Sequence, residues 1–326
     1  MEIASSPRRT ENSVSIIIPA YNEAENLGEL LDKIKSLYPT FEVIVVDDGS
    51  NDHTSEVALH HGAIVIRHPY NIGNGAAVKT GIRSSNSSIL VFMDGDGQHA
   101  PEDVGKLLEY FPAYDLVVGA RGKKSQSSLA RAVANKVYNW VGSYVSKFPI
   151  ADLTSGFRAI KRDVALELLD LLPNTFSYPT TMTLGVLRSG RSVTFVPINA
   201  TTRKKGQSKI RMFRDGARFF MIIVRICTFY SPMRVFLPVS VLSFLLGLTN
   251  YAITYFTEHR FTNMSALLFI NSVLIFMMGL ISEQVCQLRF EKHHQHVVFR
   301  ENKNQPAGGD ENPPITPALK GKSHDS

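Results

Sequence analysis

Two long apolar stretches near the C-terminus restrict the fold of this chain more than any other feature of its sequence. Residues 235–256 contain no charged side chain, and residues 264–285 contain only Glu283, close to their end. As a helix with a rise of roughly 1.5 Å per residue, each stretch has about the length that crosses the hydrocarbon core of a bilayer. The linker between them, 257–263, is too short for a domain. The sequence therefore predicts a transmembrane helical hairpin with both chain ends on one side; a hairpin buried in a soluble core is the alternative.

Basic side chains crowd on both flanks of this predicted hairpin. Lysine and arginine are frequent in 203–234 and again in 289–303, whereas the linker has only Arg260, which Glu258 offsets. Because basic loops remain on the cytoplasmic side of a membrane, we expect both flanks, the preceding domain and both termini to be cytosolic. The formal net charge of +6 is concentrated at these flanks, which argues against a nucleic-acid-binding protein. The first residues, MEIASSPRRTENS, have no apolar core, so no secretory signal is expected there.

The segment before the hairpin, 208–231, alternates basic and apolar side chains. Arg211, Arg214, Arg218 and Arg225 recur at short intervals, with phenylalanine and isoleucine between them. This pattern predicts a basic amphipathic helix that lies in the membrane interface. A helix docked on the protein's own core would give the same pattern, and that alternative stays open.

The N-terminal part of the chain alternates short apolar runs with stretches of helical periodicity. The strands predicted from the apolar runs are 13–20, 41–48, 63–68 and 88–94. The helices predicted from apolar residues three and four positions apart are 23–37, 54–61 and 75–84. Strands that alternate with helices predict a parallel sheet that is covered on both faces. In such α/β sheets the ligand site lies beyond the carboxyl ends of the strands.

Three of the predicted strands end in clusters of polar residues, with the sequences PAYNE, DDGS and DGDGQH. At the first strand end, Tyr21 is suited to stack on a base, and Glu23 is suited to accept a hydrogen bond from a ring N–H. At the second, Asp48 is suited to accept a hydrogen bond from a base or a ribose. Because asparagine and aspartate are also preferred at helix N-caps, capping is the alternative interpretation of these two clusters.

The third cluster, DGDGQH, predicts a metal site. Asp94 and Asp96 are two residues apart, so on an extended backbone both carboxylates point to the same side. Gly95 and Gly97 allow the chain to turn, which brings the pair close to one ligand. Carboxylate and amide oxygens suit Mg²⁺ or Mn²⁺, and such a cation normally also binds substrate phosphates. We therefore expect Asp96 and Gln98 to hold a cation that bridges a diphosphate, with Asp94 deeper, towards the sugar and ribose; an Asp-Gly turn that only ends a strand is the alternative.

Seven segments along the chain carry a family resemblance. In order they read PAYNEAENL, VIVVDDGSNDHT, NIGNGAAVKTGI, MDGDGQHAPED, VVGAR, ADLTSGFRAIKR and RKKGQSKI. As an ordered set they resemble the inverting nucleotide-diphospho-sugar transferases of glycosyltransferase family 2, and more narrowly the polyprenyl-phosphate sugar synthases, the dolichol-phosphate mannose synthase group. The resemblance covers about residues 13–215 and implies a GT-A fold, an α/β fold with a Rossmann-like, mostly parallel sheet. The motif reads Asp-Gly-Asp where many mannose synthases have alanine in the middle, which leaves the donor sugar open.

The resemblance also implies roles for individual residues. The nucleotide-sugar contacts would be Pro19, Tyr21, Glu23, Val46, Asp48, Asp94, Gly95, Asp96, Arg121, Arg203 and Lys209. The metal ligands would be Asp96 and Gln98, and the segment 152–158 would wall the sugar and acceptor pocket. The residues that we expect at the acceptor phosphate are Arg131, Ser155, Arg158, Lys205 and Ser208. The catalytic residues would be Asp94, Asp96 and Asp152.

The chemistry of a lipid-phosphate acceptor agrees with these roles. A lipid phosphate is already negatively charged near neutral pH, so it needs positioning more than it needs a strong base. Guanidinium groups bind phosphate oxygens in a bidentate manner. The metal and Arg203 would neutralise the charge that develops on the leaving diphosphate. Attack from the opposite face would invert the anomeric carbon, while Asp152 would orient a sugar hydroxyl or the acceptor, with a role as base left open.

The sequence thus predicts a membrane-anchored, metal-dependent hexosyltransferase. Its expected parts are a flexible N-terminus (1–12), a GT-A catalytic domain (13–207), an interfacial helix (208–231), two transmembrane helices (235–256 and 264–285) and a disordered cytosolic tail (300–326). It would move a hexose from GDP-mannose or a UDP-hexose to a polyprenyl or dolichyl phosphate at the cytosolic face. Its partners would be the donor, the acceptor and the lipid bilayer, with no nucleic acid, and homo-oligomerisation is left open. The alternatives are a processive polysaccharide synthase and a non-catalytic membrane scaffold that binds nucleotide sugar.

Overall fold

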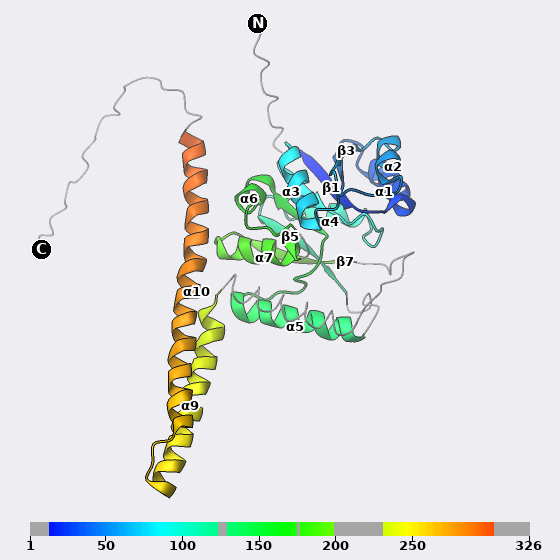
Figure 1. Cartoon of the computed structure of the whole chain (residues 1–326). Coiled ribbons are helices and arrows are strands. Elements are labelled where there is room, and N and C mark those ends of the chain that lie inside the picture. Colours follow the sequence, from blue (N-terminus) through cyan, green and yellow to red (C-terminus); the bar gives the residue numbers. More distant parts are fainter. Residues whose placement is uncertain (1–12, 123–128, 175–176, 199–230, 303–326) are drawn as a thin grey trace, which may run out of the picture.

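The computed structural model describes most of the chain (Figure 1). The described residues are 13–122, 129–174, 177–198 and 231–302. The predicted flexible N-terminus, nearly all of the predicted interfacial helix 208–231 and most of the predicted disordered tail lie outside these residues.

The N-terminal part is built on one mixed sheet with the strand order β3-β2-β1-β4-β6-β5-β7. The strands are β1 (Val14–Ala20), β2 (Glu42–Asp47), β3 (Ile64–Arg67), β4 (Ile89–Phe92), β5 (Leu116–Arg121), β6 (Arg158–Lys161) and β7 (Val193–Ile198). The pairs formed by β1, β2, β3 and β4 are parallel, as is the pair of β5 and β7. Only β6 runs antiparallel to both of its neighbours. The prediction of a mostly parallel α/β sheet is therefore confirmed.

Nine helices complete the described part of the chain. They are α1 (Ala24–Leu37), α2 (Thr54–His60), α3 (Asn74–Ser84), α4 (Asp103–Leu108), α5 (Leu129–Ser146), α6 (Arg162–Glu167), α7 (Tyr178–Arg188), α9 (Met233–Glu258) and α10 (Asn263–Asn302). The strands and helices predicted from the sequence agree closely with these, with two exceptions. Helix α10 was predicted as 264–285 but continues to Asn302, so it includes the first residues of the predicted disordered tail, 300–302. Strand β4 ends at Phe92 and not at 94. The strand therefore ends just before the acidic cluster, and the turn lies within the cluster, at Gly95 and Asp96.

Alternate side chains of β1 point into two different cores, one on each face of the sheet. Ile16 and Ile18 pack with residues of α1 and α4, whereas Ile17 packs with residues of α3, α6 and α7. All three isoleucines are fully buried. Successive side chains of a strand point to opposite faces, so a continuous apolar run is the pattern expected of a strand that is covered on both sides.

The C-terminal helices α9 and α10 pack side by side as a long hairpin that extends away from the sheet domain, and the C-terminal part of α10 continues beside that domain (Figure 1). Both are long and apolar enough to cross a membrane, over Met233–Thr257 and Asn263–Leu288. Inside the hairpin, the hydroxyls of Ser240 and Ser243 donate hydrogen bonds to backbone carbonyls of α10, at 2.9 and 3.1 Å. Most of the large apolar side chains point outwards and are exposed. This distribution fits a surface covered by lipid, because water would not favour it.

Polar contacts join the hairpin to the sheet domain. Arg234, in the first turn of α9, donates a hydrogen bond from Nη1 to the carbonyl oxygen of Val145 in α5. A carboxylate oxygen of Glu283 in α10 accepts a hydrogen bond from the backbone N–H of Met233 at 3.3 Å. The other carboxylate oxygen lies 3.8 Å from Nη2 of Arg188, at the end of α7. The single charged residue of the second apolar stretch therefore joins three helices.

Helix α3 packs so closely on β1 that one of its glycines leaves no room for a side chain. A Cβ at Gly81 would overlap the Cγ2 atom of Ile17, which is fully buried. We expect Gly81→Ala to lower stability by about 1–3 kcal/mol, because the extra methyl group overpacks the core. The measurement is the midpoint of thermal unfolding of the detergent-solubilised protein, followed by circular dichroism.

The matched control is Gly105→Ala in α4. A Cβ there would lie 3.4 Å from the Tyr38 hydroxyl, an ordinary contact, so stability should be unchanged or rise by about 0.5–1 kcal/mol. Equal midpoints for the two variants would contradict the close packing of α3 on β1.

Candidate active site

A cavity of about 550 Å³ opens beyond the carboxyl ends of β1, β2 and β4. Seven of the predicted site residues line it: Pro19, Tyr21, Glu23, Asp48, Asp94, Gly95 and Asp96. The opposite wall comes from two other segments, which contribute Thr154, Gly156, Ser177, Tyr178 and Pro179. The parallel strands thus bring the three polar strand ends to one place, as expected for a sheet of this kind.

The acidic motif lies on a turn at the floor of this cavity. Gly95 packs against β1, where a Cβ would be in ordinary contact with the Pro19 carbonyl at 3.7 Å and the Ala20 Cβ at 3.8 Å. Gly97 has a φ of +70°, which favours glycine, and completes the turn. Oδ1 of Asp96 accepts a hydrogen bond of 3.1 Å from the backbone N–H of Gln98. The two metal ligands predicted from the sequence are therefore neighbours in the turn.

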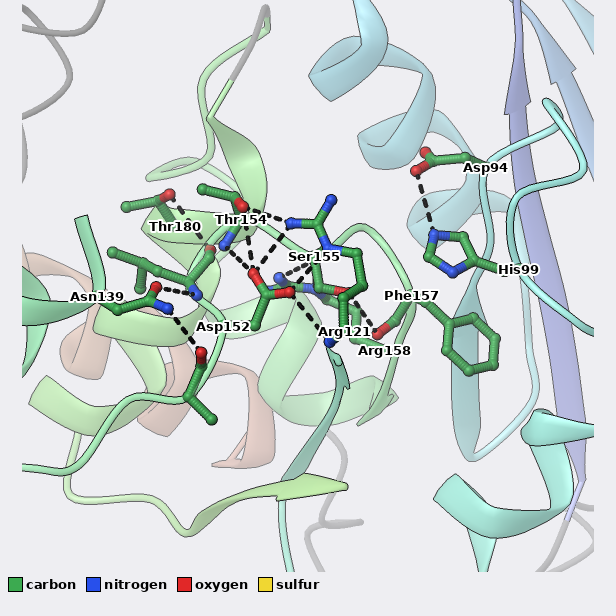
Figure 2. Close-up of polar contacts among 12 residues, drawn as sticks. Asp94, His99, Arg121, Asn139, Asp152, Thr154, Ser155, Phe157, Arg158 and Thr180 are labelled. Carbon is green, nitrogen blue, oxygen red and sulfur yellow. Dashed lines mark hydrogen bonds and ion pairs between the residues drawn. The ribbon is translucent and has the colours of Figure 1, made fainter. Parts of the chain in front are cut away.

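Asp94 lies in a narrow slot between two features that the sequence analysis did not single out (Figure 2). A Cβ at Gly156 would be 2.5 Å from Oδ2 of Asp94, so any side chain there would displace the carboxylate from its present position. On the other side, Nε2 of the buried His99 lies 3.8 Å from the same oxygen. The His99 ring stacks on Phe157, with 5.1 Å between ring centroids. The one signal in the sequence that could have identified His99 is its position inside the acidic motif.

Asp48 holds the glycine-rich loop against the cavity. Its two carboxylate oxygens accept hydrogen bonds from the backbone N–H groups of Ile72 and Gly73, at 3.0 and 2.8 Å. Nδ1 of His68 donates a third, at 2.7 Å. Asp48 is 3 % exposed and lies at the wall of the cavity. The neighbouring Val46 is fully buried in a small core cluster and does not line the cavity.

Arg121 and Asp152 form a closed ion pair behind the cavity wall (Figure 2). Nε and Nη2 of Arg121 donate to the two carboxylate oxygens of Asp152, at 2.8 and 3.1 Å. Nη2 also donates to the hydroxyl of Thr154, which lines the cavity, at 2.6 Å. Burial alone would raise the pKa of Asp152, but the hydrogen bonds and charge of Arg121 outweigh it and hold that pKa below its usual range. Burial alone would lower the pKa of Arg121, but the hydrogen bonds and charge of Asp152 outweigh it and raise that pKa above its usual value.

Arg158 and Ser155 are fully buried and do not line the cavity. The Arg158 side chain is 0 % exposed and donates hydrogen bonds to the carbonyls of Ser155 and Pro179 and to the hydroxyl of Thr183. Burial lowers the pKa of its guanidinium to about 10, so it remains charged near neutral pH. Arg158 therefore ties the cavity wall at Ser155 to the first turn of α7, where Tyr178 begins the helix.

The remaining predicted phosphate ligands are not among the described side chains. Arg203, Lys205, Ser208 and Lys209 lie in 199–230, outside the described residues. Arg131 belongs to α5, but its side chain is also outside the described part. The structure therefore unites the donor side of the predicted site and leaves its basic C-terminal part untested.

The oxygen atoms around the cavity suit a divalent cation of the magnesium type. Within the described residues, no three histidine, cysteine, aspartate or glutamate side chains lie close enough to hold a metal alone. Asp96 and Gln98 would supply one carboxylate and one amide oxygen. A small hard cation keeps several waters and takes its other ligands from phosphates, so this short ligand set fits it.

Comparison with known proteins places the chain among glycosyltransferases. Residues 15–169 match the family model described as "Glycosyl transferase family 2", and residues 231–288 match the model "GtrB C-terminal hairpin". An undecaprenyl-phosphate mannosyltransferase of Micrococcus luteus is 32 % identical over 211 residues, 60 % of this chain and 87 % of that protein. A polyprenol monophosphomannose synthase of Mycolicibacterium smegmatis is 34 % identical over 212 residues, 60 % of this chain and 80 % of that protein.

Solved structures confirm the GT-A type of fold. Glucosyl-3-phosphoglycerate synthase from Mycobacterium tuberculosis, in complex with Mn²⁺, UDP and glucosyl-3-phosphoglycerate, superposes with a TM-score of 0.53. The match covers 66 % of this chain and 79 % of that chain at 18 % identity, so it concerns the fold alone.

The ion pair of Asp152 and Arg121 predicts a stability that depends on pH. Because its pKa is lowered in the folded state, Asp152 contributes stability above its ordinary pKa of about 3.9 and loses it as pH falls through the folded value. We expect Asp152→Asn to cost about 2 kcal/mol near neutral pH, less than for a fully buried pair because Arg121 is partly exposed. The measurement is the thermal unfolding midpoint of both proteins as a function of pH.

The difference in unfolding midpoint between wild type and Asp152→Asn should narrow as the pH falls below about 4. The exposed carboxylate of Glu109 provides a control, and Glu109→Gln should leave the midpoint nearly unchanged at every pH. A difference in midpoint that is constant across the whole pH range would show that the ion pair is not the source of the stability lost in Asp152→Asn.

Proposed function

Because this chain belongs to glycosyltransferase family 2, we propose that it transfers a hexose from a nucleotide-diphosphate sugar to a polyprenyl or dolichyl phosphate. The observation that carries this proposal is the cavity at the ends of β1, β2 and β4, where seven residues expected to bind a nucleotide sugar meet. The names of the relatives support the acceptor, since they are called undecaprenyl-phosphate and polyprenol transferases. An apolar hairpin after the sheet domain suits an acceptor that resides in a bilayer.

The donor is a GDP-sugar or a UDP-sugar, and two lines of support point to different nucleotides. The relatives are named for mannosyl transfer, which GDP-mannose would supply. The synthase with the similar fold binds UDP. At the nucleotide end of the cavity, Tyr21 is 43 % exposed and available to stack on a base. Stacking accepts any base, so Tyr21 itself would not select the nucleotide.

We propose that Asp96 and Gln98 bind Mg²⁺ or Mn²⁺. The synthase with the similar fold has been solved with either ion together with UDP. When bound, the cation would neutralise the charge of the leaving diphosphate. Asp94, 35 % exposed in its slot, would meet the sugar or ribose of the donor. Gly156 and His99 fix the direction in which its carboxylate points.

Asp152 is proposed to position Arg121 and not to act as a general base. Both of its carboxylate oxygens accept hydrogen bonds from Arg121, and its lowered pKa makes it a weak proton acceptor. A phosphate acceptor is ionised before it reacts, so no base is required. Arg121, oriented in this way beside Thr154, would direct positive charge to the phosphate side of the cavity.

The hairpin is proposed to span the membrane twice, with the sheet domain and both termini in the cytosol. Basic residues flank both ends of the hairpin near the domain, and the linker at its far end carries Arg260 beside Glu258. The positive-inside rule places the basic side in the cytosol. The predicted homo-oligomer stays a proposal without a specific interface.

The experiment that tests the function uses membranes from cells that express the chain, with membranes from the same cells lacking it as the control. They are incubated with a panel of labelled GDP- and UDP-sugars and a polyprenyl phosphate, and organic-soluble product is measured. We expect one donor to give a glycolipid. Absence of product across the panel would overturn the proposal and favour a non-catalytic sugar-nucleotide scaffold.

Asp96→Ala should abolish this transfer. Loss of the carboxylate removes a predicted metal ligand, and we expect a fall in rate of about 100-fold or more, as when charge stabilisation in a transition state is lost. Circular dichroism should be unchanged, because the side chain lies at the cavity and not in the core. Glu109→Ala, at an exposed carboxylate directly after α4, is the matched control and should stay active. An active Asp96→Ala protein would refute the metal role.

A further inference from the structure

The end of β3 brings a fourth polar side chain to the edge of the sheet where the cavity opens. His68 directly follows Arg67, the last residue of β3. Its backbone N–H donates a hydrogen bond of 2.8 Å to the carbonyl of Asp47, at the end of β2. His68 is only 8 % exposed and does not line the cavity. Any part that it has in ligand binding must therefore act through a neighbour.

Both ring nitrogens of His68 have a partner. Nδ1 lies 2.7 Å from Oδ1 of Asp48, and Nε2 lies 2.9 Å from the hydroxyl oxygen of Thr80 on α3. A carboxylate only accepts hydrogen bonds, so Nδ1 carries the hydrogen, and Nε2 of the neutral ring accepts from the Thr80 hydroxyl. The three side chains thus form a chain of hydrogen bonds that joins α3 to the carboxyl end of β2.

Asp48 connects His68 to the glycine-rich loop 71–75. A carboxylate has about four acceptor positions. Among the described residues three are occupied: His68 and the N–H of Ile72 donate to Oδ1, and the N–H of Gly73 donates to Oδ2. The position that is left is on Oδ2, and Asp48 belongs to the lining of the cavity. A ring N–H or a hydroxyl of a nucleotide therefore has one acceptor there, whose place the other three contacts determine.

A close backbone contact holds the same loop where it begins. Gly49 has a φ of +74°, and a Cβ there would lie 2.4 Å from the carbonyl carbon of Tyr70 and 2.8 Å from the backbone nitrogen of Asn71. The loop therefore lies directly on the chain that follows β2, with no side chain between them. Three residues at the loop line the cavity: Asn71, Gly73 and Asn74. The position of this wall thus depends on the contacts at the end of β2.

We infer that His68 and Thr80 are positioning residues for the nucleotide of the donor. Neither lines the cavity, and both act through Asp48, which they align with the N–H groups of the loop. Without the His68 donor a buried carboxylate would lose one of its partners, and an incompletely paired buried charge is costly. Asp48 would then turn away from its present direction, and the loop would lose a fixed support. The inference rests on the proposed function, because that function supplies the nucleotide.

The packing of this side of the sheet does not require the polar chain. The core here is apolar and consists of Ile44, Val46 and Ala77, with Ile66 packed against it. Buried polar and charged groups contribute no more to stability than well-packed apolar side chains of similar size. Their value at this place is directional, since a hydrogen-bonded imidazole gives the Asp48 carboxylate a single orientation.

The first test measures nucleotide binding by the full-length chain in detergent. The probes are GDP and UDP, each with Mg²⁺, and the dissociation constant is obtained by calorimetry. His68→Ala should raise the Kd of the nucleotide that binds by about tenfold, the change expected when one charge-assisted hydrogen bond is lost. The control is His60→Asn, at an exposed histidine that ends α2, and it should bind as wild type does.

Two amide variants separate the roles of the two ring nitrogens. The amide nitrogen of asparagine takes the place of Nδ1, whereas that of glutamine reaches the place of Nε2. His68→Asn should therefore bind within about threefold of wild type, and His68→Gln should bind as weakly as His68→Ala. Thr80→Ser, which keeps the hydroxyl, should bind better than Thr80→Val. Equal binding by the two amide variants would overturn the inference, because a role in packing alone requires only a polar side chain of similar size.

The route through Asp48 is tested by hydrogen exchange, which requires no nucleotide. The backbone amides of Ile72 and Gly73 donate to Asp48, so their exchange reports how well its carboxylate is held. His68→Ala should accelerate their exchange by about tenfold, and His68→Asn should not. Adding His68→Ala to Asp48→Ala should give no further acceleration, because the shared acceptor is already absent. Unchanged exchange in His68→Ala, or additive effects of the two substitutions, would overturn the inference.

A kinetic readout connects the inference to transfer. A group that holds the donor equally in the ground state and the transition state changes KM and leaves kcat unchanged. His68→Ala should raise KM for the donor by about tenfold, with kcat and the KM for polyprenyl phosphate unchanged. A lower kcat at an unchanged donor KM would contradict a positioning role. If no nucleotide binds and no transfer occurs in any protein, the proposed function fails, while hydrogen exchange still decides whether His68 positions Asp48 and the loop.

Discussion

The parallel pairing of β1 with β2 on one side and β4 on the other is the constraint on which the site depends. The two ladders have different lengths. Pairing with β2 continues to the end of β1, where Ala20 lies opposite Asp47, whereas pairing with β4 stops where Ile17 lies opposite Phe92. The last residues of β1 therefore lose one neighbour, and the turn that contains Gly95 packs into the vacated position beside Pro19 and Ala20. The cavity exists because one strand ends before its partner.

Sequence patterns predicted this arrangement because parallel strands bring their carboxyl ends to one edge. Continuous apolar runs located β1, β2 and β4, and the polar residues after them identified Tyr21, Asp48, Asp94 and Asp96. The direction of β6 was not predictable in the same way, since a short strand has the same local pattern in either orientation. Its antiparallel course brings Gly156 to the acidic turn, so the slot around Asp94 depends on contacts between distant parts of the chain.

Individual arginines show the limit of sequence reasoning more clearly. Arg158 was expected at the acceptor phosphate because its motif resembles that of a family, and its charge alone suits such a ligand. In the structure it is fully buried and bound to carbonyl and hydroxyl oxygens. Arg121 has the same charge but lies behind the cavity wall, paired with Asp152 and in contact with the cavity-lining Thr154. Charge identifies candidates, but packing decides whether an arginine is buried in the protein or lies next to the cavity.

The contacts of Glu283 impose an order on the assembly of the protein. Its two partners, the N–H of Met233 and the guanidinium of Arg188, precede it in the chain, and α7 and the start of α9 are synthesised well before α10. During translation the N–H of Met233 and the guanidinium of Arg188 therefore have no contact with the Glu283 carboxylate until α10 has left the ribosome. A nascent chain that is halted between the two helices would carry a folded domain on a membrane segment to which it is not yet fastened.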